Sequence, residues 1–461
     1  MDSRENVYSS SFSAWINLIC MLSENIILKE LSKIIDPDFN RDIVSLGFIK
    51  NLSIDGGNVS FSIELTTPAC PYKPIFKKQA TDLILNIEDV DNVTINMTAR
   101  SSQRILKNED SGLKNVKYIL AISSCKGGVG KSTISAIIAK TLSARGFNVG
   151  LLDADIYGPS IPTIFNIHKP GIRTSENNKF YPKIVDGLKL MSFGFLMGDG
   201  PAVIRGPMVA QYSQQLLHNV LWGDLDYLII DMPPGTGDIQ LTISQSVQID
   251  SSVIVTTPHQ LSLTDVRKGI MMFDKVNIPV LGIIENMSYF KCDIGKKYYI
   301  FGEAGAKSLN ERFGLKTLIE LPIIKELNSS YDSIMNSEYS SNTVDEVIRA
   351  IGKKVVEKPE MPEINFDQDN ISLKWKNKIF TVSNFELRRS CACALCIDEM
   401  TRKPLLDPES IPKDIHAKKI NTIGNYALLI DWSDGHNTGF FTFKSIKDLS
   451  MKNTKAYSCE I

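Results

Sequence analysis

The segment 125–133 has the composition and spacing of a loop that binds phosphates. It follows the apolar run Tyr118–Ile122 and precedes apolar residues at helical spacing, a context in which backbone N–H groups and a helix N-terminus cradle a polyphosphate. Lys131 can reach the β- and γ-oxygens, and Ser132 can bind Mg²⁺. We predict that this nucleotide-binding loop consists of Cys125, Lys126, Gly127, Gly128, Val129, Gly130, Lys131, Ser132 and Thr133.

Two further apolar runs end in carboxylates that fit the chemistry of phosphoryl transfer. Leu151–Asp155 brings Asp153 and Asp155 to the end of one expected strand, and Tyr227–Asp231 ends another. Phosphoryl transfer needs ligands for Mg²⁺, an oriented water and cationic charge near the γ-phosphate. We expect Asp231 to support Mg²⁺ and Asp155 to orient the water. Asp153 is expected to lie in the layer around these groups and to contact them, not the nucleotide.

Two cations and a following turn complete this expected catalytic set. Lys131 serves the nucleotide of its own loop, whereas Lys126 is surplus to one site and is expected to act on another. The predicted catalytic residues are therefore Lys126, Lys131, Asp153 and Asp155. Pro233–Gly237 is read either as a switch that senses the γ-phosphate or as a rigid turn.

A second group of residues has the character of a metal site. Cys391, Cys393 and Cys396 lie on one short segment, and His436 follows about 40 positions later. Three thiolates and one imidazole suit Zn²⁺ in a closed tetrahedral site. The same thiols could instead hold an iron–sulfur cluster. Cys70, in a proline-flanked turn, is read either as a ligand or as a small buried apolar residue.

The surrounding pattern predicts three domains in an α/β chain. Residues 116–352 alternate apolar strands with helical segments, which indicates a doubly wound parallel sheet carrying the phosphate loop. Residues 24–100 predict a small α/β domain, with a helix over Ile26–Ile35 and a strand with Val59, Phe61, Ile63 and Leu65 buried. Residues 366–461 predict a small, mainly β domain. A tail (1–23) and two linkers (101–115 and 353–365) join these parts.

Composition limits the function classes. The chain has 461 residues, 43% apolar and 22% charged, and a formal charge of −1, so no global field attracts nucleic acid or an anionic membrane. No apolar run is long enough to span a bilayer. Eight cysteines, three of them clustered, favour metal ligands over disulfides. The acidic residues near the N-terminus favour a cytoplasmic protein.

The central motifs, Cys125–Thr133, Asp153–Ser160, Asp231–Asp238 and Glu285–Ser288, resemble the Mrp/ApbC iron–sulfur carrier ATPases. The resemblance implies an ATP-hydrolysing homodimer with the nucleotides between the subunits and Lys126 reaching the partner's phosphates. It implies that Asn286 reads adenine. Many of these carriers have a Cys-x-x-Cys pair after this motif, but here Cys292 lacks the second thiol, so Cys292 alone is not a sufficient ligand for a [4Fe–4S] cluster.

The flanking domains carry resemblances of their own. Asp36–Pro37, Asp42–Gly47 and Thr66–Pro71 resemble the small domain of cytosolic iron–sulfur assembly factors, in which Cys70 matches a reactive cysteine. The C-terminal segment resembles the N-terminal β domain of butyrobetaine-type hydroxylases, which binds structural zinc. This domain order resembles the plastid-type high-chlorophyll-fluorescence scaffold branch of the carriers, which makes a plastid or a mitochondrion-related organelle the alternative location.

The resemblance implies a carrier that uses ATP and Mg²⁺ to pass a [4Fe–4S] cluster from upstream donors to apo-proteins, without nucleic acid or membrane as partners. One alternative is a positioning ATPase of the MinD/ParA type. Residues 447–461 show no clear basic amphipathic helix, which speaks against that alternative. Another alternative is an ATPase adaptor whose only metal is structural zinc.

Overall fold

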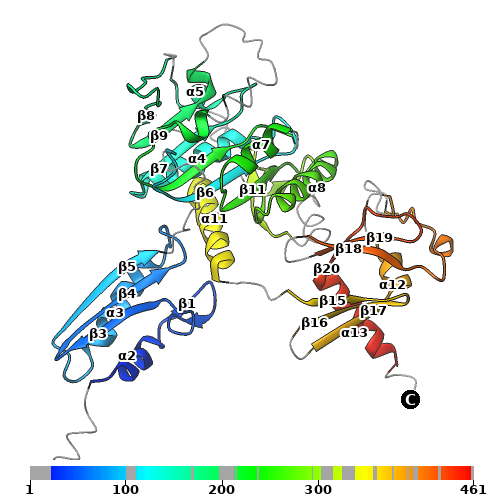
Figure 1. Cartoon of the computed structure of the whole chain (residues 1–461), viewed down its shortest axis with the longest axis horizontal. Coiled ribbons are helices and arrows are strands. Elements are labelled where there is room, and N and C mark those ends of the chain that lie inside the picture. Colours follow the sequence, from blue (N-terminus) through cyan, green and yellow to red (C-terminus); the bar gives the residue numbers. More distant parts are fainter. Residues whose placement is uncertain are drawn as a thin grey trace, which may run out of the picture. The chain divides into compact units, whose positions relative to one another are not determined.

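The structure is a computed structural model, and its elements are drawn in Figure 1. It describes residues 22–99, 111–167, 171–196, 212, 215–235, 238–292, 294–302, 315–323, 338–356, 361–375, 378–391, 393, 395–397, 403–423 and 427–457. Nearly all of the expected tail, and residues 101–110 of the first linker, lie outside this set. Among the described residues, no helix combines the length and the apolar character needed to cross a membrane.

The chain forms two compact units, of which the first comprises Met1–Ser101 and Ile351–Glu357. Its three-stranded sheet has the order β3-β4-β5, with β4 antiparallel to β3 and parallel to β5. The parallel pair needs a crossover, which α3 supplies. The elements are α2 (Glu24–Leu31), β1 (Ile35–Asp36), β2 (Arg41–Asp42), β3 (Ile49–Asp55), β4 (Asn58–Leu65), α3 (Lys73–Leu85) and β5 (Asn92–Ala99).

One expectation for this unit is confirmed and another is wrong. The predicted alternation of the fourth strand is confirmed, because Val59, Phe61, Ile63 and Leu65 are at most 2% exposed. The predicted helix over Ile26–Ile35 is too long, since α2 ends at Leu31. Ile35 pairs instead with Asp42 in the short β1–β2 ladder, which takes the backbone out of the helix.

The central part of the second unit is a nine-stranded sheet. Its path is β13-β12-β11-β6-β10-β7-β9-β8, with β14 also paired to β12, and only the β8–β9 and β12–β13 pairs are antiparallel. The predicted parallel α/β domain is confirmed. Its elements are β6 (Val116–Ser123), α4 (Lys131–Ala144), β7 (Val149–Asp153), α5 (Ile161–Ile164), β8 (Lys183–Val185), β9 (Leu188–Ser192), η1 (Phe193–Phe195), β10 (Leu225–Asp231), α7 (Asp238–Ser246), β11 (Ser251–Thr256), α8 (Gln260–Lys275), β12 (Val280–Lys291), β13 (Lys297–Tyr298), β14 (Thr317–Pro322) and α11 (Glu338–Val356).

The C-terminal part contains two antiparallel three-stranded sheets, β15-β16-β17 and β18-β19-β20. They enclose one apolar core to which Trp432 and Ile446 belong. The elements are β15 (Glu363–Phe366), β16 (Asn370–Trp375), β17 (Lys378–Ser383), α12 (Asn384–Arg389), η3 (Pro408–Ser410), β18 (Ala417–Ile423), β19 (Ala427–Trp432), β20 (Phe440–Thr442) and α13 (Phe443–Tyr457).

Two sequence expectations at this end need correction. The predicted linker 353–365 is partly regular, because α11 continues to Val356 and β15 already begins at Glu363. A helix, α13, also covers most of 447–461, where no clear basic amphipathic helix was expected. Its apolar residues Phe443 and Ile446 are buried in the domain core, so they are not available to a membrane surface.

Candidate functional site: a phosphate loop and a thiol-imidazole centre

The phosphate loop connects the central strand β6 to α4, as the sequence predicts. Gly128 and Gly130 have φ angles of 77° and 84°, a backbone region that favours glycine. A Cβ at Gly130 would lie 2.2 Å from the amide nitrogen of Asn286, so no larger residue fits there. The loop therefore enters the helix at a point where its backbone is closely approached by β12.

The lysine of this loop is buried beside a carboxylate from the neighbouring strand. The Nζ atom of Lys131 lies 2.7 Å from Oδ1 of Asp231 and 3.3 Å from Oγ of Ser132. Ser135 also donates to the same carboxylate oxygen. The second oxygen, Oδ2 of Asp231, is buried and has no hydrogen-bond partner among the described residues. A buried carboxylate oxygen next to a serine hydroxyl fits the oxygen ligands that Mg²⁺ prefers.

Asp153 stands directly beside Asp231, since the two are paired residues of β7 and β10. Its oxygens accept hydrogen bonds from the backbone of Asp155 and Ile161 and from the hydroxyl of Ser192. Burial, followed by the charge of Asp231, raises the pKa of Asp153 to about 7. Asp153 therefore braces the loop after β7.

Asp155 belongs to the turn that Asp153 holds. Its Oδ1 accepts from the backbone N–H of Gly158 at 3.2 Å, and the residue is 8% exposed. The role expected for it, orienting a water, stays a prediction.

The segment after β10 is tied to the start of the phosphate loop. The backbone N–H of Gly235 donates to the carbonyl of Ser124 at 2.9 Å. The side-chain amide of Gln240 donates to Ser123 at 3.2 Å and also to the carbonyl of Pro233. The turn after β10 is thus hydrogen-bonded to the segment that leads into the phosphate loop. Thr236 and Gly237, the end of the predicted switch, lie outside the described residues.

Three other predicted loop residues have distinct surroundings. Asn286 donates its side-chain amide to the carbonyl of Val129 at 2.9 Å, so it braces the loop, and adenine reading stays a prediction. The Lys126 side chain is exposed. Burial raises the pKa of the Cys125 thiol to about 12, which keeps it protonated at neutral pH, and a backbone hydrogen bond from Gly269 opposes that rise.

The four predicted metal ligands of the C-terminal domain do come together. Their ligand atoms lie within 4.8 Å of one another, although Cys391 follows α12 and His436 comes from the loop after β19. The Nε2 atom of His436 lies 3.3 Å from Sγ of Cys391, 3.5 Å from Cys393 and 3.9 Å from Cys396. Bonds of about 2.3 Å to sulfur and about 2.0 Å to nitrogen in a tetrahedron separate S and N by about 3.5 Å. The spacing fits one ion.

The pKa values of these thiols depend on the hydrogen bonds between them. A hydrogen bond from Cys391 lowers the pKa of Cys393, and that same bond raises the pKa of Cys391. Burial raises the pKa of Cys396. One thiolate held by two neighbouring thiols and an imidazole is the arrangement that a bound cation would stabilise further.

A second layer of residues, which the sequence analysis did not identify, orients these ligands. Arg388 is 4% exposed; its Nε lies 2.8 Å from Asp434, and its Nη1 contacts the sulfur of Cys396 at 3.5 Å. Asp434 in turn accepts from the backbone N–H of His436 at 2.9 Å. Outer partners of this kind fix ligand geometry. The available signal was the position of Arg388, three residues before Cys391 in a helical segment.

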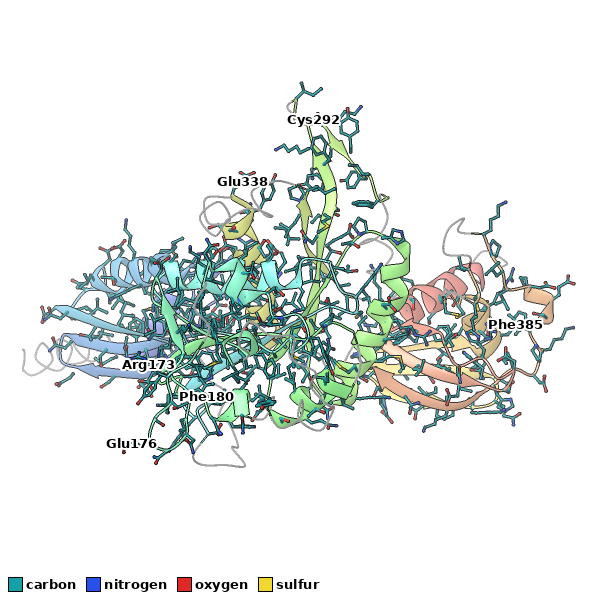
Figure 2. All side chains as sticks on the ribbon, turned by 90° about the horizontal axis from the view of Figure 1, so that it is seen from above. Arg173, Glu176, Phe180, Cys292, Glu338 and Phe385 are labelled. Atoms are coloured by element: carbon teal, nitrogen blue, oxygen red, sulfur yellow. The ribbon has the colours of Figure 1, made fainter. Side chains whose placement is uncertain are left out.

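Two further cysteines discussed above, Cys70 and Cys292, lie in other parts of the fold. Cys70 packs against the apolar core of the first unit, and burial raises its pKa to about 11, which favours the small-apolar reading. Cys292 lies at the tip of the β12–β13 hairpin, which projects from the sheet (Figure 2). Cys20 and Cys459 are outside the described residues.

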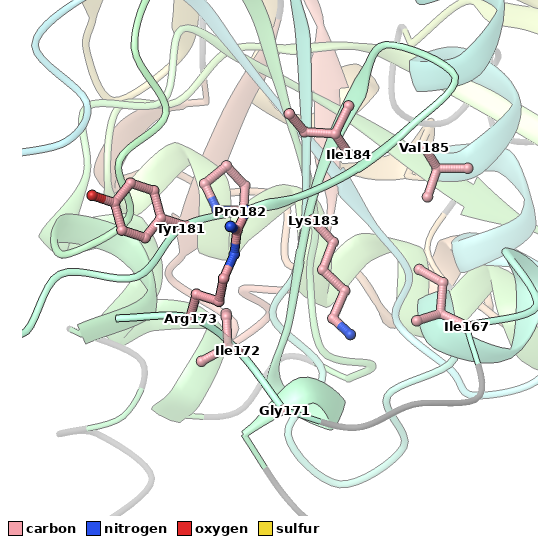
Figure 3. A pocket seen from close by; sticks show the side chains of 9 residues that line it. All are labelled: Ile167, Gly171, Ile172, Arg173, Tyr181, Pro182, Lys183, Ile184 and Val185. Carbon is pink, nitrogen blue, oxygen red and sulfur yellow. The ribbon is translucent and has the colours of Figure 1, made fainter. Parts of the chain in front are cut away.

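A hollow of about 490 Å³ lies beside β8 (Figure 3). Its rim carries Arg173, whose guanidinium carbon lies 5.9 Å from the centroid of the Tyr181 ring. No residue of the phosphate loop or of the thiol-imidazole centre lines it. This hollow is therefore separate from the predicted chemistry.

Three known families match different parts of the chain. Residues 115–356 match the family described as NUBPL iron-transfer P-loop NTPase. Residues 24–96 match the family described as iron-sulfur cluster assembly protein, and residues 363–447 match gamma-butyrobetaine hydroxylase-like, N-terminal.

Individual relatives extend the similarity beyond one domain. The chain is 41% identical to the chloroplastic Fe-S cluster assembly factor HCF101 of Arabidopsis thaliana, over 90% of this chain and 81% of that protein. It is 39% identical to the iron-sulfur cluster carrier protein of Synechocystis, over 74% of this chain and 99% of that protein. Among solved structures, a nucleotide-binding protein from Archaeoglobus fulgidus in complex with ADP is 37% identical, covering 51% of this chain and 90% of that chain at a TM-score of 0.43.

Proposed function

The chain belongs to the family of iron-transfer P-loop NTPases that includes the iron–sulfur cluster carriers, and from this premise we propose an ATP-dependent [4Fe–4S] carrier that supplies apo-proteins. The observation that carries the proposal is the phosphate loop with its buried Lys131–Asp231 pair, in a chain 41% identical to an Fe-S cluster assembly factor along 90% of its length.

The nucleotide site works through charge that is already in place. Lys131 touches both Asp231 and Ser132, so its ammonium lies where a phosphate oxygen and the metal ligands would meet. The free oxygen of Asp231 and the hydroxyl of Ser132 would support Mg²⁺, which neutralises phosphate charge when bound. The hydrogen bond from Gly235 to Ser124 lets a change at the phosphates move the turn after β10.

We assign Lys126 to the nucleotide of a second subunit. Its side chain is exposed at the phosphate loop, whereas Lys131 is buried and serves its own site. A homodimer with the nucleotide between its subunits would use both lysines. ATP-dependent dimerisation that is lost in Lys126→Ala, while nucleotide binding persists, would support this assignment.

We assign Zn²⁺ to the Cys391, Cys393, Cys396 and His436 centre. A cubane cluster bonds its ligands through different irons, which holds the ligand atoms farther apart than one ion does. Ligand atoms within 4.8 Å of one another favour the single ion. Bound zinc would fix the loops of this domain, and the [4Fe–4S] cargo would be held at other groups.

The decisive experiment is anaerobic reconstitution of the full chain with iron and sulfide. We expect an iron–sulfur chromophore in the wild type and loss of nucleotide turnover in Lys131→Ala, with partial survival of cluster assembly. Equal loss of both would mean that nucleotide is needed to build the site.

An ATPase adaptor whose only metal is zinc is the second candidate, favoured by the mononuclear geometry of the thiol-imidazole centre. It predicts about one zinc for each chain and no iron or sulfide after reconstitution. That outcome would overturn the carrier proposal while leaving the zinc assignment intact.

A further inference from the structure

Arg267 of helix α8 contacts the C-terminal domain. The guanidinium carbon of Arg267 lies 5.1 Å from the centroid of the Phe440 ring, a cation–π distance. The Nε atom of Arg267 is buried and has no hydrogen-bond partner among the described residues. Burial lowers the pKa of Arg267, and the charges of Cys393 and Cys391 counteract that effect. The arginine thus senses the thiols electrostatically.

The ring under this arginine belongs to the segment that encloses the thiols. Thr438 donates its hydroxyl to the sulfur of Cys393 at 3.2 Å. A Cβ at Gly439 would lie 2.6 Å from the sulfur of Cys391, so the backbone approaches that ligand closely. Phe440 follows immediately, and its position therefore depends on the geometry of the ligands.

The same helix contacts the phosphate loop through a glycine. A Cβ at Gly269 would lie only 2.5 Å from the sulfur of Cys125, so the thiol rests against the helix backbone. Residues two apart in a helix point to different faces, which places Arg267 and Gly269 on different sides of α8. One rigid helix therefore touches the phosphate loop with one face and the thiol-imidazole domain with another.

We propose that Arg267 is a positioning residue through which occupancy of the thiol-imidazole centre by a divalent metal ion strengthens nucleotide binding at the phosphate loop. The inference rests on the proposed binding of metal and nucleotide, and it adds an energetic link between the two sites. Neither Arg267 nor Gly269 contacts the nucleotide in this account; both act through Cys125 and α8.

Ordering of the ligands gives the link its direction. A divalent ion bound by the three sulfurs and the imidazole fixes the segment of Thr438 and Gly439, and with it the ring of Phe440 against Arg267. A fixed ring holds Arg267, and through it α8, in the position that supports Cys125. A loop that is already held loses less conformational entropy when nucleotide binds, so the metal-loaded chain binds nucleotide more tightly.

The test is the affinity of the full chain for a fluorescent ADP analogue at fixed Mg²⁺, with zinc loaded or removed by a chelator that is then dialysed away. We expect zinc to tighten ADP binding by about fivefold or more. Arg267→Ala should bind ADP equally with and without zinc, and Arg267→Lys should keep part of the difference. Lys275→Ala, an exposed lysine at the end of the same helix, should behave like the wild type.

Reciprocity separates coupling from a structural effect. ADP must tighten zinc binding in the wild type by the same factor, and must not do so in Arg267→Ala. A wild-type ratio near one, or an unchanged ratio in Arg267→Ala, overturns the inference while both binding sites stand. Absence of zinc or nucleotide binding altogether overturns the proposed function as well.

Discussion

The ammonium nitrogen of Lys131 lies 2.7 Å from a carboxylate oxygen of Asp231, and these side chains are 6% and 0% exposed. A phosphate that enters the loop therefore finds a lysine whose charge is already balanced by a buried acid. Binding exchanges one anionic partner of Lys131 for another. Because breaking this pair costs free energy of folding, the stability of variants tests the pair independently of catalysis.

Lys131→Met should lower the free energy of unfolding by about 3 kcal/mol, because it leaves the Asp231 carboxylate buried without its counter-ion. The double variant Lys131→Met/Asp231→Asn should regain most of that loss but none of the nucleotide turnover. Urea denaturation together with phosphate release measures both effects.

Lys117→Met is the matched control, since Lys117 of β6 also pairs with a carboxylate of β10, Asp226, at 2.8 Å, but with 55% of the lysine side chain exposed. Its loss should cost about 1 kcal/mol at most. If both lysine variants lose the same stability, burial of the Lys131 pair has no energetic weight.

Asp153 predicts a pH dependence of stability. Its pKa rises from 3.8 to about 7 on folding, so the folded chain binds more protons in this interval and loses stability as pH rises through it. Asp153→Asn removes this pH-dependent contribution to the free energy of unfolding. The hydrogen bonds that the substitution weakens lower the stability by the same amount at every pH. Relative to the wild type, the variant should gain about 2 to 3 kcal/mol between pH 5 and pH 8. A constant difference in unfolding free energy would contradict the raised pKa.

The sequence could predict the nucleotide loop because its determinants are local. Glycines at positive φ, the lysine and the serine stand within nine residues, and the strands ending at Asp153 and Asp231 are continuous apolar runs. The Lys131–Asp231 pair spans 100 positions. It forms because β6, which leads into the phosphate loop, lies beside β10, and the sequence alone does not give this strand order.

Arg388 offers a test of the thiol-imidazole centre that leaves all four ligands in place. Arg388→Ala should weaken zinc binding about 10- to 100-fold, because Asp434 and Cys396 both lose their partner. Arg389→Ala, a neighbouring residue with an exposed side chain, should retain wild-type affinity. Competition with a chromophoric chelator provides the measurement. Equal affinities for the two variants would remove Arg388 from the site.

Asn286 distinguishes bracing of the loop from recognition of adenine. Because its amide bonds the carbonyl of Val129, Asn286→Ala should weaken ATP and GTP binding alike, by about tenfold. Asn96→Ala, an exposed asparagine of β5, should change neither affinity. A loss confined to ATP would instead support the adenine-reading role that the family resemblance implies.

The metal centre shows where prediction from sequence ends. The spacing of the three clustered cysteines marks them as metal ligands in the sequence. His436 joins them only because β19 and the loop after it return to α12. The position of Arg388 before Cys391 was a signal, but its partner Asp434 lies 46 positions away, and Arg267 reaches Phe440 from a distant helix. The core contacts of α13 could not be read from the sequence, because Phe443 and Ile446 join a core whose other members lie far along the chain.

The most direct measurement of the central claim is cluster transfer from the anaerobically reconstituted full chain, its thiol-imidazole centre loaded with zinc, to an apo-protein that accepts a [4Fe–4S] cluster. The account predicts iron and acid-labile sulfide in equal amounts on the chain, arrival of the chromophore on the acceptor, and a transfer rate that ATP changes in the wild type but not in Lys131→Met. A chain that binds zinc and ATP, yet carries neither iron nor sulfide and passes nothing to the acceptor, would contradict it.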